Sequence, residues 1–127
     1  MPSTVPFELI SPAEVVFEGD AELVIVVTTE GEEGILPRHA PLLAALRPGV
    51  LRANVVRDGT VSRLELVTGV GFLQALPDRV TVLADETYRF EDVDVAKTRE
   101  DLARALEQDD RLAAELAQAK LRLTGRS

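Results

Sequence analysis

The sequence of 127 residues contains no cysteine, few aromatic residues and no long hydrophobic run. Without cysteine, the chain cannot form a disulfide framework, a thiolate zinc site or an iron–sulfur cluster. Aromatic residues make up only 4% of the chain, which favours an aliphatic packed scaffold over a surface that stacks nucleic-acid bases. The apolar run at residues 23–27 has five residues, whereas a membrane-spanning helix needs about 20. We therefore expect a soluble chain without direct membrane insertion.

Basic residues are in the minority. The chain has 14 lysine and arginine residues against 22 aspartate and glutamate residues, which gives a net charge of −8. This excess of negative charge argues against binding to nucleic acid or anionic lipid through a basic face. Hydrophobic residues make up 46% of the chain, an ordinary share for a globular protein that excludes wholesale disorder.

Residues 1–88 show the alternation of apolar runs and turns that is typical of β-structure. A turn at residues 18–20 is predicted to end one strand, and the β-branched run at residues 23–27 forms the next. Asp58-Gly59 predicts a tight hairpin turn, and residues 77–78 predict another turn. Short strands at roughly ten-residue spacing, with Gly or Pro at the turns, predict an antiparallel β-sandwich or barrel.

The segment at residues 30–43 interrupts this alternation. It contains Pro37, Pro41 and the only histidine of the chain, His39. Because proline fixes φ and removes a backbone donor, the segment is predicted to be a rigid loop outside any sheet. A stiff loop that is also apolar is more often a docking surface than a solvated connector. The apolar residues of this loop are Ile35, Leu36, Leu42 and Leu43.

Residues 89–127 change to a helical pattern, with no proline and a single glycine after Asp94. Asp92 or Asp94 can cap a first helix, and an aspartate of the break at residues 108–110 can cap a second. The pattern predicts an antiparallel hairpin of two helices of roughly 14 residues each. Helices this short are marginal in water, so we expect the hairpin to depend on docking, to the sandwich or to another protein.

Two stripes of apolar residues are expected to form the core of this hairpin and, if it opens, a surface for partners. The stronger stripe, in the second helix, follows i, i+4, i+7, i+11 spacing and consists of Leu112, Leu116, Ala119 and Leu123. The weaker stripe, in the first helix, consists of Val95, Leu102 and Leu106.

No set of residues predicts a catalytic or metal site. His39 has no second histidine or cysteine to work with, so neither catalysis nor metal binding is expected of it. The acidic residues Glu30, Glu32 and Glu33 lack the oxygen-ligand spacing of a calcium loop. Gly69-Val70-Gly71 lacks the third glycine of a dinucleotide-binding fingerprint, and close backbone packing within the sheet explains it better.

Several motifs occur together in a specific order and spacing. They are residues 30–43, Arg47-Pro48-Gly49-Val50-Leu51, Gly69-Val70-Gly71-Phe72, residues 80–86 and Glu91-Asp92-Val93-Asp94. In these motifs, and over nearly its whole length, the chain resembles the epsilon subunit of F-type rotary ATP synthases. One position departs from the common pattern, since Arg38 stands where the family commonly has glycine.

The resemblance implies a β-sandwich of about ten strands at residues 1–88 and a regulatory two-helix hairpin at residues 89–127. It implies a non-catalytic subunit without a cofactor, in the central rotor stalk of a proton-translocating complex peripheral to the cytoplasmic face of the plasma membrane. The implied partners are the gamma subunit, the rotor-ring c subunits and, through helices that block hydrolysis when extended, the alpha and beta subunits. The residues implied to face the rotor ring and gamma are Glu32, Ile35, Leu36, Pro37, Arg38, His39, Ala40, Pro41 and Leu42.

Many bacterial members of this family bind ATP through the pattern I/L-D-x-x-R-A at the start of the first helix. The matching residues here are Val93, Asp94, Lys97 and Thr98, with Arg104 further along. Lysine cannot reproduce the planar fork of a guanidinium. The resemblance therefore implies at most weak, regulatory ATP binding, at Val93, Asp94, Lys97 and Arg104.

The residues alone leave an alternative open. A free-standing β-sandwich that binds protein, with a helical tail that recruits another partner, would show the same strands and helices. Co-purification with the gamma subunit would favour the synthase, and its absence would favour the free-standing module.

Overall fold

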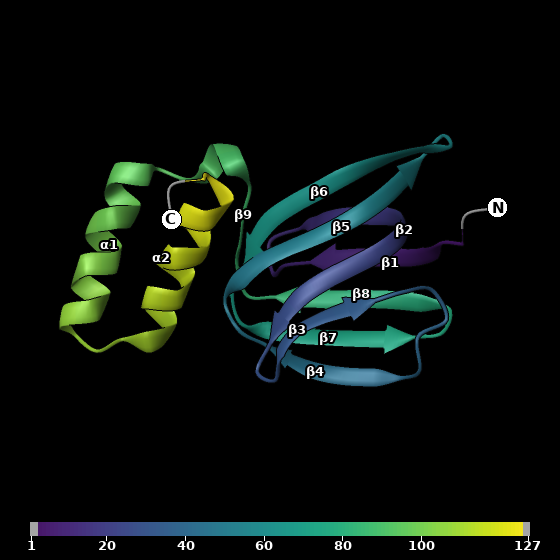
Figure 1. Cartoon of the computed structure of the whole chain (residues 1–127), viewed down its shortest axis with the longest axis horizontal. Coiled ribbons are helices and arrows are strands. Elements are labelled where there is room, and N and C mark those ends of the chain that lie inside the picture. The colour runs from purple at the N-terminus through teal and green to yellow at the C-terminus, as the bar shows by residue number, and fades with distance from the viewer. Residues whose placement is uncertain (1–2, 126–127) are drawn as a thin grey trace.

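The computed structural model of the chain describes residues 3–125. Figure 1 shows two layers of strands with a pair of helices at one end. Within the described residues there are nine strands, one short 3-10 helix and two α-helices. Their bounds are β1 Val5–Ile10, β2 Val15–Thr28, β3 Gly31–Ile35, β4 Leu42–Leu46, β5 Gly49–Arg57, β6 Thr60–Thr68, β7 Gly71–Leu76, β8 Arg79–Ala84, β9 Thr87–Tyr88, η1 Phe90–Asp92, α1 Val95–Glu107 and α2 Arg111–Leu123. The predicted sandwich followed by two helices is confirmed.

The strands form one sheet that folds over on itself. Hydrogen-bonded neighbours follow the order β1-β8-β7-β4-β2-β5-β6-β9, with β3 paired to β2 and β1 also paired to β2. Strand β1 therefore links the layer of β2, β5 and β6 to the layer of β4, β7 and β8 (Figure 1). The prediction of an antiparallel sheet was wrong at one pairing, because β1 and β8 run parallel. No hairpin turn joins these two strands, so no turn fixes their relative direction.

Strand β2 is a single element of 14 residues, which corrects the prediction of a turn at residues 18–20. Gly19 continues the strand and pairs with Phe7 of β1. A Cβ atom at Gly19 would lie 3.0 Å from the Phe17 ring, so the glycine makes room for an aromatic side chain. A register shift between Ala21 and Leu23 bends the strand where its pairing with β1 ends. The two strands expected at residues 15–17 and 23–27 are therefore one strand.

The two predicted hairpin turns are confirmed. Asp58 and Gly59 have φ values of 51° and 75°, the left-handed conformation that a type I′ turn requires at both central residues. They join β5 to β6, whose pairing is continuous. Residues 77–78 join β7 to β8, which pair in the same uninterrupted way.

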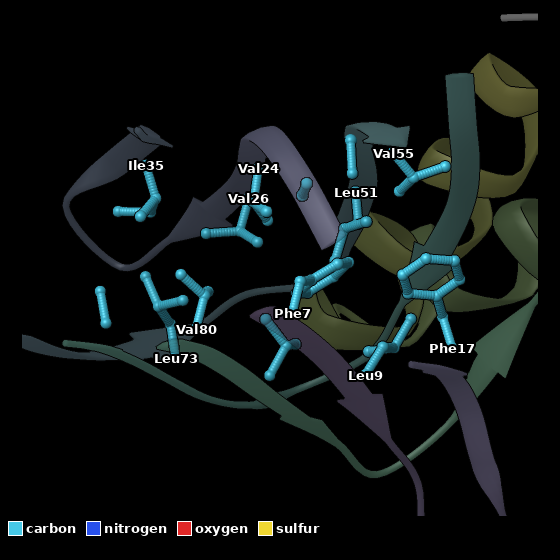
Figure 2. Packing of buried hydrophobic residues seen from close by; sticks show 14 of the residues in the cluster. Phe7, Leu9, Phe17, Val24, Val26, Ile35, Leu51, Val55, Leu73 and Val80 are labelled. Carbon is cyan, nitrogen blue, oxygen red and sulfur yellow. The ribbon is translucent and has the colours of Figure 1, made fainter. Parts of the chain in front are cut away.

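The core lies between the two strand layers and is built from strands alone. All of its buried residues lie between Val5 and Ala84. Figure 2 shows Phe7 beside Phe17, and the two ring centroids are 5.5 Å apart. Aliphatic side chains such as Leu51 fill most of the remaining space. The sandwich therefore buries its core without help from the helices.

Both helices begin at aspartates that the sequence predicts as caps. Asp94 Oδ1 accepts a hydrogen bond of 3.1 Å from the Lys97 backbone N–H, and Asp110 Oδ1 accepts one of 3.2 Å from the Ala113 backbone N–H. These bonds satisfy donors that have no partner within the helix. Each helix has 13 residues. Within residues 3–125, no helix is long and apolar enough to cross a membrane.

Helix α2 lies between α1 and the sandwich, so two of its faces are covered (Figure 1). Ala114, Ala117 and Leu121, at i, i+3 and i+7, are buried on the face toward α1. Each residue turns the helix by about 100°, so Ala119 points to the other side. Ala119 is fully buried there, against the sandwich.

The leucine stripe predicted as the hairpin core faces the sandwich in α2, so that prediction was wrong there, whereas Val95 and Leu102 of the α1 stripe are half-buried. The stripe of α2 centres on Ala119, the side turned toward the sandwich, and Leu112 at its start is 52% exposed. In α1 the buried residues are Thr98 and Ala105, whereas Leu106 is exposed. Small side chains fill the contact between the helices because they let the two backbones approach closely.

Candidate functional site

The Pro-rich segment contains a much shorter loop than predicted. Residues 31–35 form β3 on β2, and residues 42–46 form β4 on β7, which leaves only residues 36–41 as loop. The prediction of a single loop over residues 30–43 was wrong because backbone pairing on both sides extends into it. Ile35 is fully buried in the core and Leu42 packs against that core. The Ile35 side chain thus supports the sandwich and does not reach its surface.

The remaining loop is a tight, exposed turn. Leu36 is 60% exposed, and its carbonyl accepts a hydrogen bond of 3.2 Å from the His39 backbone N–H. Arg38 has a φ of 65°, the left-handed region that glycine adopts most easily, which explains the family's preference for glycine here. The Arg38 N–H donates to the Pro77 carbonyl at 3.2 Å and anchors the turn to the end of β7. The same turn contains the other predicted loop residues, Pro37, Ala40 and Pro41.

The polar residues of this region form local pairs. His39 Nε2 lies 3.9 Å from Glu33 Oε1, and its Nδ1 lies 2.6 Å from the Ala40 carbonyl oxygen. Glu32 accepts a hydrogen bond of 2.8 Å from Arg52 Nη2. The described part of the chain contains no cluster of three or more acidic or histidine side chains that could hold a metal ion.

Strands β4, β7 and β8 carry an outward apolar strip, of which only Leu43 was predicted from the sequence as part of a docking surface. Its main members are Leu43, 71% exposed, Phe72, 55% exposed, and Leu83, 47% exposed. Phe72 pairs directly with Leu83 on one side and with Ala45 on the other. A groove of about 610 Å³ lies beside Phe72 and Leu83. Contiguous apolar surface of this kind marks an interaction site on a soluble protein.

A signal for this strip was present in the sequence. The run at residues 42–46 has aliphatic side chains at every position, and Phe72 and Leu73 are likewise two apolar neighbours in one strand. A strand that is apolar on both faces is expected to be covered on both faces. In this fold the core covers only one of them.

The residues assigned to weak ATP binding lie at the start and on the surface of α1. The Asp94 carboxylate caps the helix, and Val93 lies between η1 and α1. Lys97 Nζ lies 3.6 Å from Asp101 Oδ2, and Arg104 Nη1 donates to Asp101 Oδ1 at 2.9 Å. The structure thus brings Lys97 and Arg104 together around the single carboxylate of Asp101, which contacts both cations. A nucleotide phosphate would compete with Asp101 for both cations.

Helix α2 is held to the sandwich by polar contacts on two sides. Arg47, between β4 and β5, forms two hydrogen bonds with the Glu115 carboxylate, of which the one from Nε to Oε1 is 3.2 Å long. Lys120 lies over the ring of Tyr88, whose hydroxyl donates a hydrogen bond to Glu86. Burial, and then this hydrogen bond, raises the pKa of Tyr88 to about 12. The sequence analysis quoted Arg47 in a motif but assigned no contact to it.

The close backbone packing predicted for the Gly69-Val70-Gly71 motif is confirmed at Gly71, whereas Gly69 lies close to side chains. A Cβ atom at Gly71 would lie 1.8 Å from the Leu83 carbonyl oxygen, and one at Gly69 would lie 2.2 Å from Asp85 Oδ1. Burial, and then the neighbouring charge of Glu86, raises the pKa of Asp85. These glycines shape the sheet and do not form a nucleotide-binding turn.

Comparison with known proteins gives the family. Residues 4–90 match the family described as ATP synthase, Delta/Epsilon chain, beta-sandwich domain. The ATP synthase epsilon chain of Rhodospirillum rubrum is 43% identical over 130 residues, which cover 94% of this chain and 91% of that protein. The ATP synthase epsilon chain of Halorhodospira halophila is 39% identical over 123 residues, which cover 94% of this chain and 86% of that protein.

The fold is also similar to that of a solved chain. In the cryo-EM structure of the Euglena gracilis mitochondrial ATP synthase, OSCP/F1/c-ring in rotational state 1, one chain matches with a TM-score of 0.73 at 21% identity. The match covers 99% of this chain and 80% of that chain. At this identity the likeness shows the fold alone. The family match and the relatives confirm the resemblance found in the sequence: the chain belongs to the family of ATP synthase epsilon chains, which are non-catalytic subunits of the synthase.

Proposed function

We propose that this chain couples the gamma subunit to the membrane rotor ring in the central stalk and that its two C-terminal helices regulate ATP hydrolysis. In this role it transmits torque and has no active site of its own. It belongs to the proton-translocating complex at the cytoplasmic face of the plasma membrane, to which it attaches through protein partners.

The apolar strip of Leu43, Phe72 and Leu83 is the observation that carries this proposal. It leaves apolar area exposed in the isolated chain, and burial of such area is worth about 25 cal/mol per Å². The strip lies on paired strands of the rigid sandwich, so a partner docked there would turn with the chain as one body. We assign it to gamma because transmission of torque requires a broad, non-slipping contact within the stalk.

The turn at residues 36–41 is assigned to the rotor ring. It is narrow and exposed, and its anchoring to the Pro77 carbonyl through Arg38 makes it stiff. A small stiff turn suits contact with the loops of a ring better than broad packing along a shaft. The exposed residues of the turn, which are the most available for this contact, are Leu36, Arg38, Ala40 and Pro41.

The helices are assigned a regulatory role through contact with the alpha and beta subunits. No core residue of the sandwich comes from them, so they can leave the sandwich without unfolding it. Helix α1 packs chiefly against α2, and α2 alone makes the main contacts with β5 and β6. A marginal element that can be released is suited to a switch.

An affinity purification from detergent-solubilised membranes tests the coupling role. The tagged parent chain should recover gamma, alpha, beta and the rotor-ring subunits, identified by mass. Phe72→Glu should lose them, because it places a charge in the middle of the strip. Val61→Glu is the matched control, since Val61 is also a half-exposed apolar residue, on β6. Equal recovery with both variants would refute the strip as the docking surface. If the parent chain recovered none of these subunits, the alternative of a free-standing protein-binding module would be favoured.

Truncation tests the regulatory role. A chain that ends before Phe90 should still assemble with the other subunits, because its core is complete. The assembled complex should hydrolyse ATP faster than the complex with the full chain. Equal hydrolysis rates would exclude a regulatory role of the helices in this protein.

A further inference from the structure

One ion pair connects two parts of the chain that are far apart in sequence. Arg47 offers its Nε and Nη2 donors to the two oxygens of Glu115, a paired geometry that a lysine could not provide. The side chains are 38% and 19% exposed, so solvent only partly screens the pair. Figure 1 shows α2, which contains Glu115, as the helix that lies against the sandwich.

Contacts within the sandwich fix the backbone at Arg47. The Arg47 backbone N–H donates to the Val27 carbonyl of β2 at 3.0 Å. Two residues later, Gly49 packs so closely on Val27 that a Cβ atom there would lie 2.6 Å from Val27 Cγ2. The turn between β4 and β5 is therefore fixed to β2. Because the backbone at Arg47 is already fixed, only side-chain freedom is lost when its guanidinium binds the carboxylate, which favours the pair.

The apolar contact beneath α2 is small by comparison. Ala119 and Val67 are fully buried, and Val67 lies outside the sandwich core, at the end of β6 near α2. Toward the end of the helix, a hollow of about 370 Å³ beside Leu123 and Val50 shows that packing there is incomplete. Leu116 and Leu123 on the same side of the helix are only half-buried, so apolar burial beneath α2 is incomplete and polar contacts add to the docking free energy.

We propose that the ion pair between Arg47 and Glu115 holds the helical hairpin on the sandwich, so that docking weakens as ionic strength rises. The cation–π contact of Lys120 with Tyr88 is a second, weaker interaction that holds the same helix. This inference deepens the proposed regulation, on which it rests, by naming the residues that set the population of the docked state.

A thiol on the covered face of α2 measures that population directly. The natural chain contains no cysteine, so Ala119→Cys introduces a single thiol at a fully buried position. When the helix detaches and redocks quickly, the rate of thiol labelling is proportional to the undocked fraction. We would measure this rate in the full chain with Arg47→Glu, Glu115→Arg, and both changes together.

Each single reversal should accelerate labelling about tenfold or more, because it leaves like charges facing each other. The double exchange restores opposite charges and should bring the rate back to within about threefold of the parent. Added salt should speed labelling of the parent chain. Matched controls are Arg63→Glu and Glu100→Arg, at exposed residues that take part in no ion pair within residues 3–125.

Two results would refute the proposed role of the ion pair between Arg47 and Glu115. One is a single reversal that labels no faster than the controls, and the other is a double exchange that labels as fast as a single reversal. A second thiol, Ala75→Cys in the sandwich core, must stay protected in every background, which separates release of the helix from unfolding. The measurement uses the free chain, so it can fail while the stalk role stands, or succeed if that role is refuted.

Discussion

The ammonium group of Lys120 lies 3.8 Å from the centre of the Tyr88 ring, and the hydroxyl of that tyrosine donates a hydrogen bond to Glu86. Lys120 belongs to α2, whereas Tyr88 forms part of the short strand β9 at the edge of β6. A cation over an aromatic ring contributes about 0.5–1 kcal/mol at an exposed site. The pair therefore places the tyrosine at the joint between the sandwich and the helices.

Tyr88 should titrate at unusually high pH. Burial, and then the hydrogen bond to Glu86, raises its pKa from 10.0 to about 12. Because the folded-state pKa is the higher one, this stabilisation is complete below pH 10.0 and is lost as the pH rises through about 12. The chain has one tyrosine and no tryptophan, so tyrosinate absorbance reports this residue alone. Glu86→Gln should lower the midpoint, and a folded parent that titrates at 10.0 would contradict the burial.

Gly71→Ala should destabilise the sandwich. Its new Cβ atom would lie 1.8 Å from the Leu83 backbone oxygen, so β7 and β8 would have to separate. We expect the free energy of unfolding to fall by about 1–3 kcal/mol or more in urea denaturation. Gly34→Ala is the control, because the nearest atom, Leu23 Cδ1, would be 3.8 Å away. If both variants were equally stable, the close approach of the two strands would be disproved.

Val67→Ala should destabilise only the chain that keeps its helices. Val67 is fully buried but lies outside the sandwich core, on β6, a strand that contacts α2, so we expect α2 to cover it. We expect a loss of about 1–2 kcal/mol in the full chain and much less in a chain that ends before Phe90. Leu66→Ala, at a neighbouring core residue, should cost about 2–5 kcal/mol in both chains. Equal effects of Val67→Ala in the two chains would show that α2 does not cover this residue.

ATP should bind the free chain weakly. Lys97 and Arg104 are both engaged by Asp101, and a lysine replaces the forked arginine of the family pattern. Calorimetry should give a dissociation constant above about 1 mM for the parent chain. The double variant Lys97→Arg with Asp101→Asn should bind ATP more tightly, whereas Asp109→Asn, at an exposed aspartate, should not. A micromolar dissociation constant for the parent would refute the expectation.

Local sequence signals predicted the elements that depend only on their own residues. The turn at Asp58-Gly59 and the caps at Asp94 and Asp110 are confirmed because each is decided within a few residues of chain. The turn expected at residues 18–20 is wrong because the neighbouring Phe17 ring, not a change of direction, requires the glycine. The loop expected at residues 30–43 is shorter in the structure because its two ends pair with β2 and β7, which is a long-range effect.

The two candidate docking surfaces also differ in whether local or long-range effects decide them. The exposed turn at residues 36–41 could be located from its prolines, since their constraint is local. For the strip around Phe72 the sequence offers only the apolar run at residues 42–46, because the members of the strip come from strands that only the fold brings together. The pairing of Arg47 with Glu115 is likewise invisible in the sequence, where nothing connects the two positions.

The sequence by itself determined a β-sandwich followed by two capped helices, the absence of any thiol chemistry, and the family. Only the tertiary structure decided which faces of α2 are covered, that Ile35 belongs to the core, and that an ion pair fastens the helices to the sandwich. The physical reason is the range of the forces involved. Backbone preferences and caps act between near neighbours, whereas burial and charge pairing depend on which distant segments the folded chain places in contact.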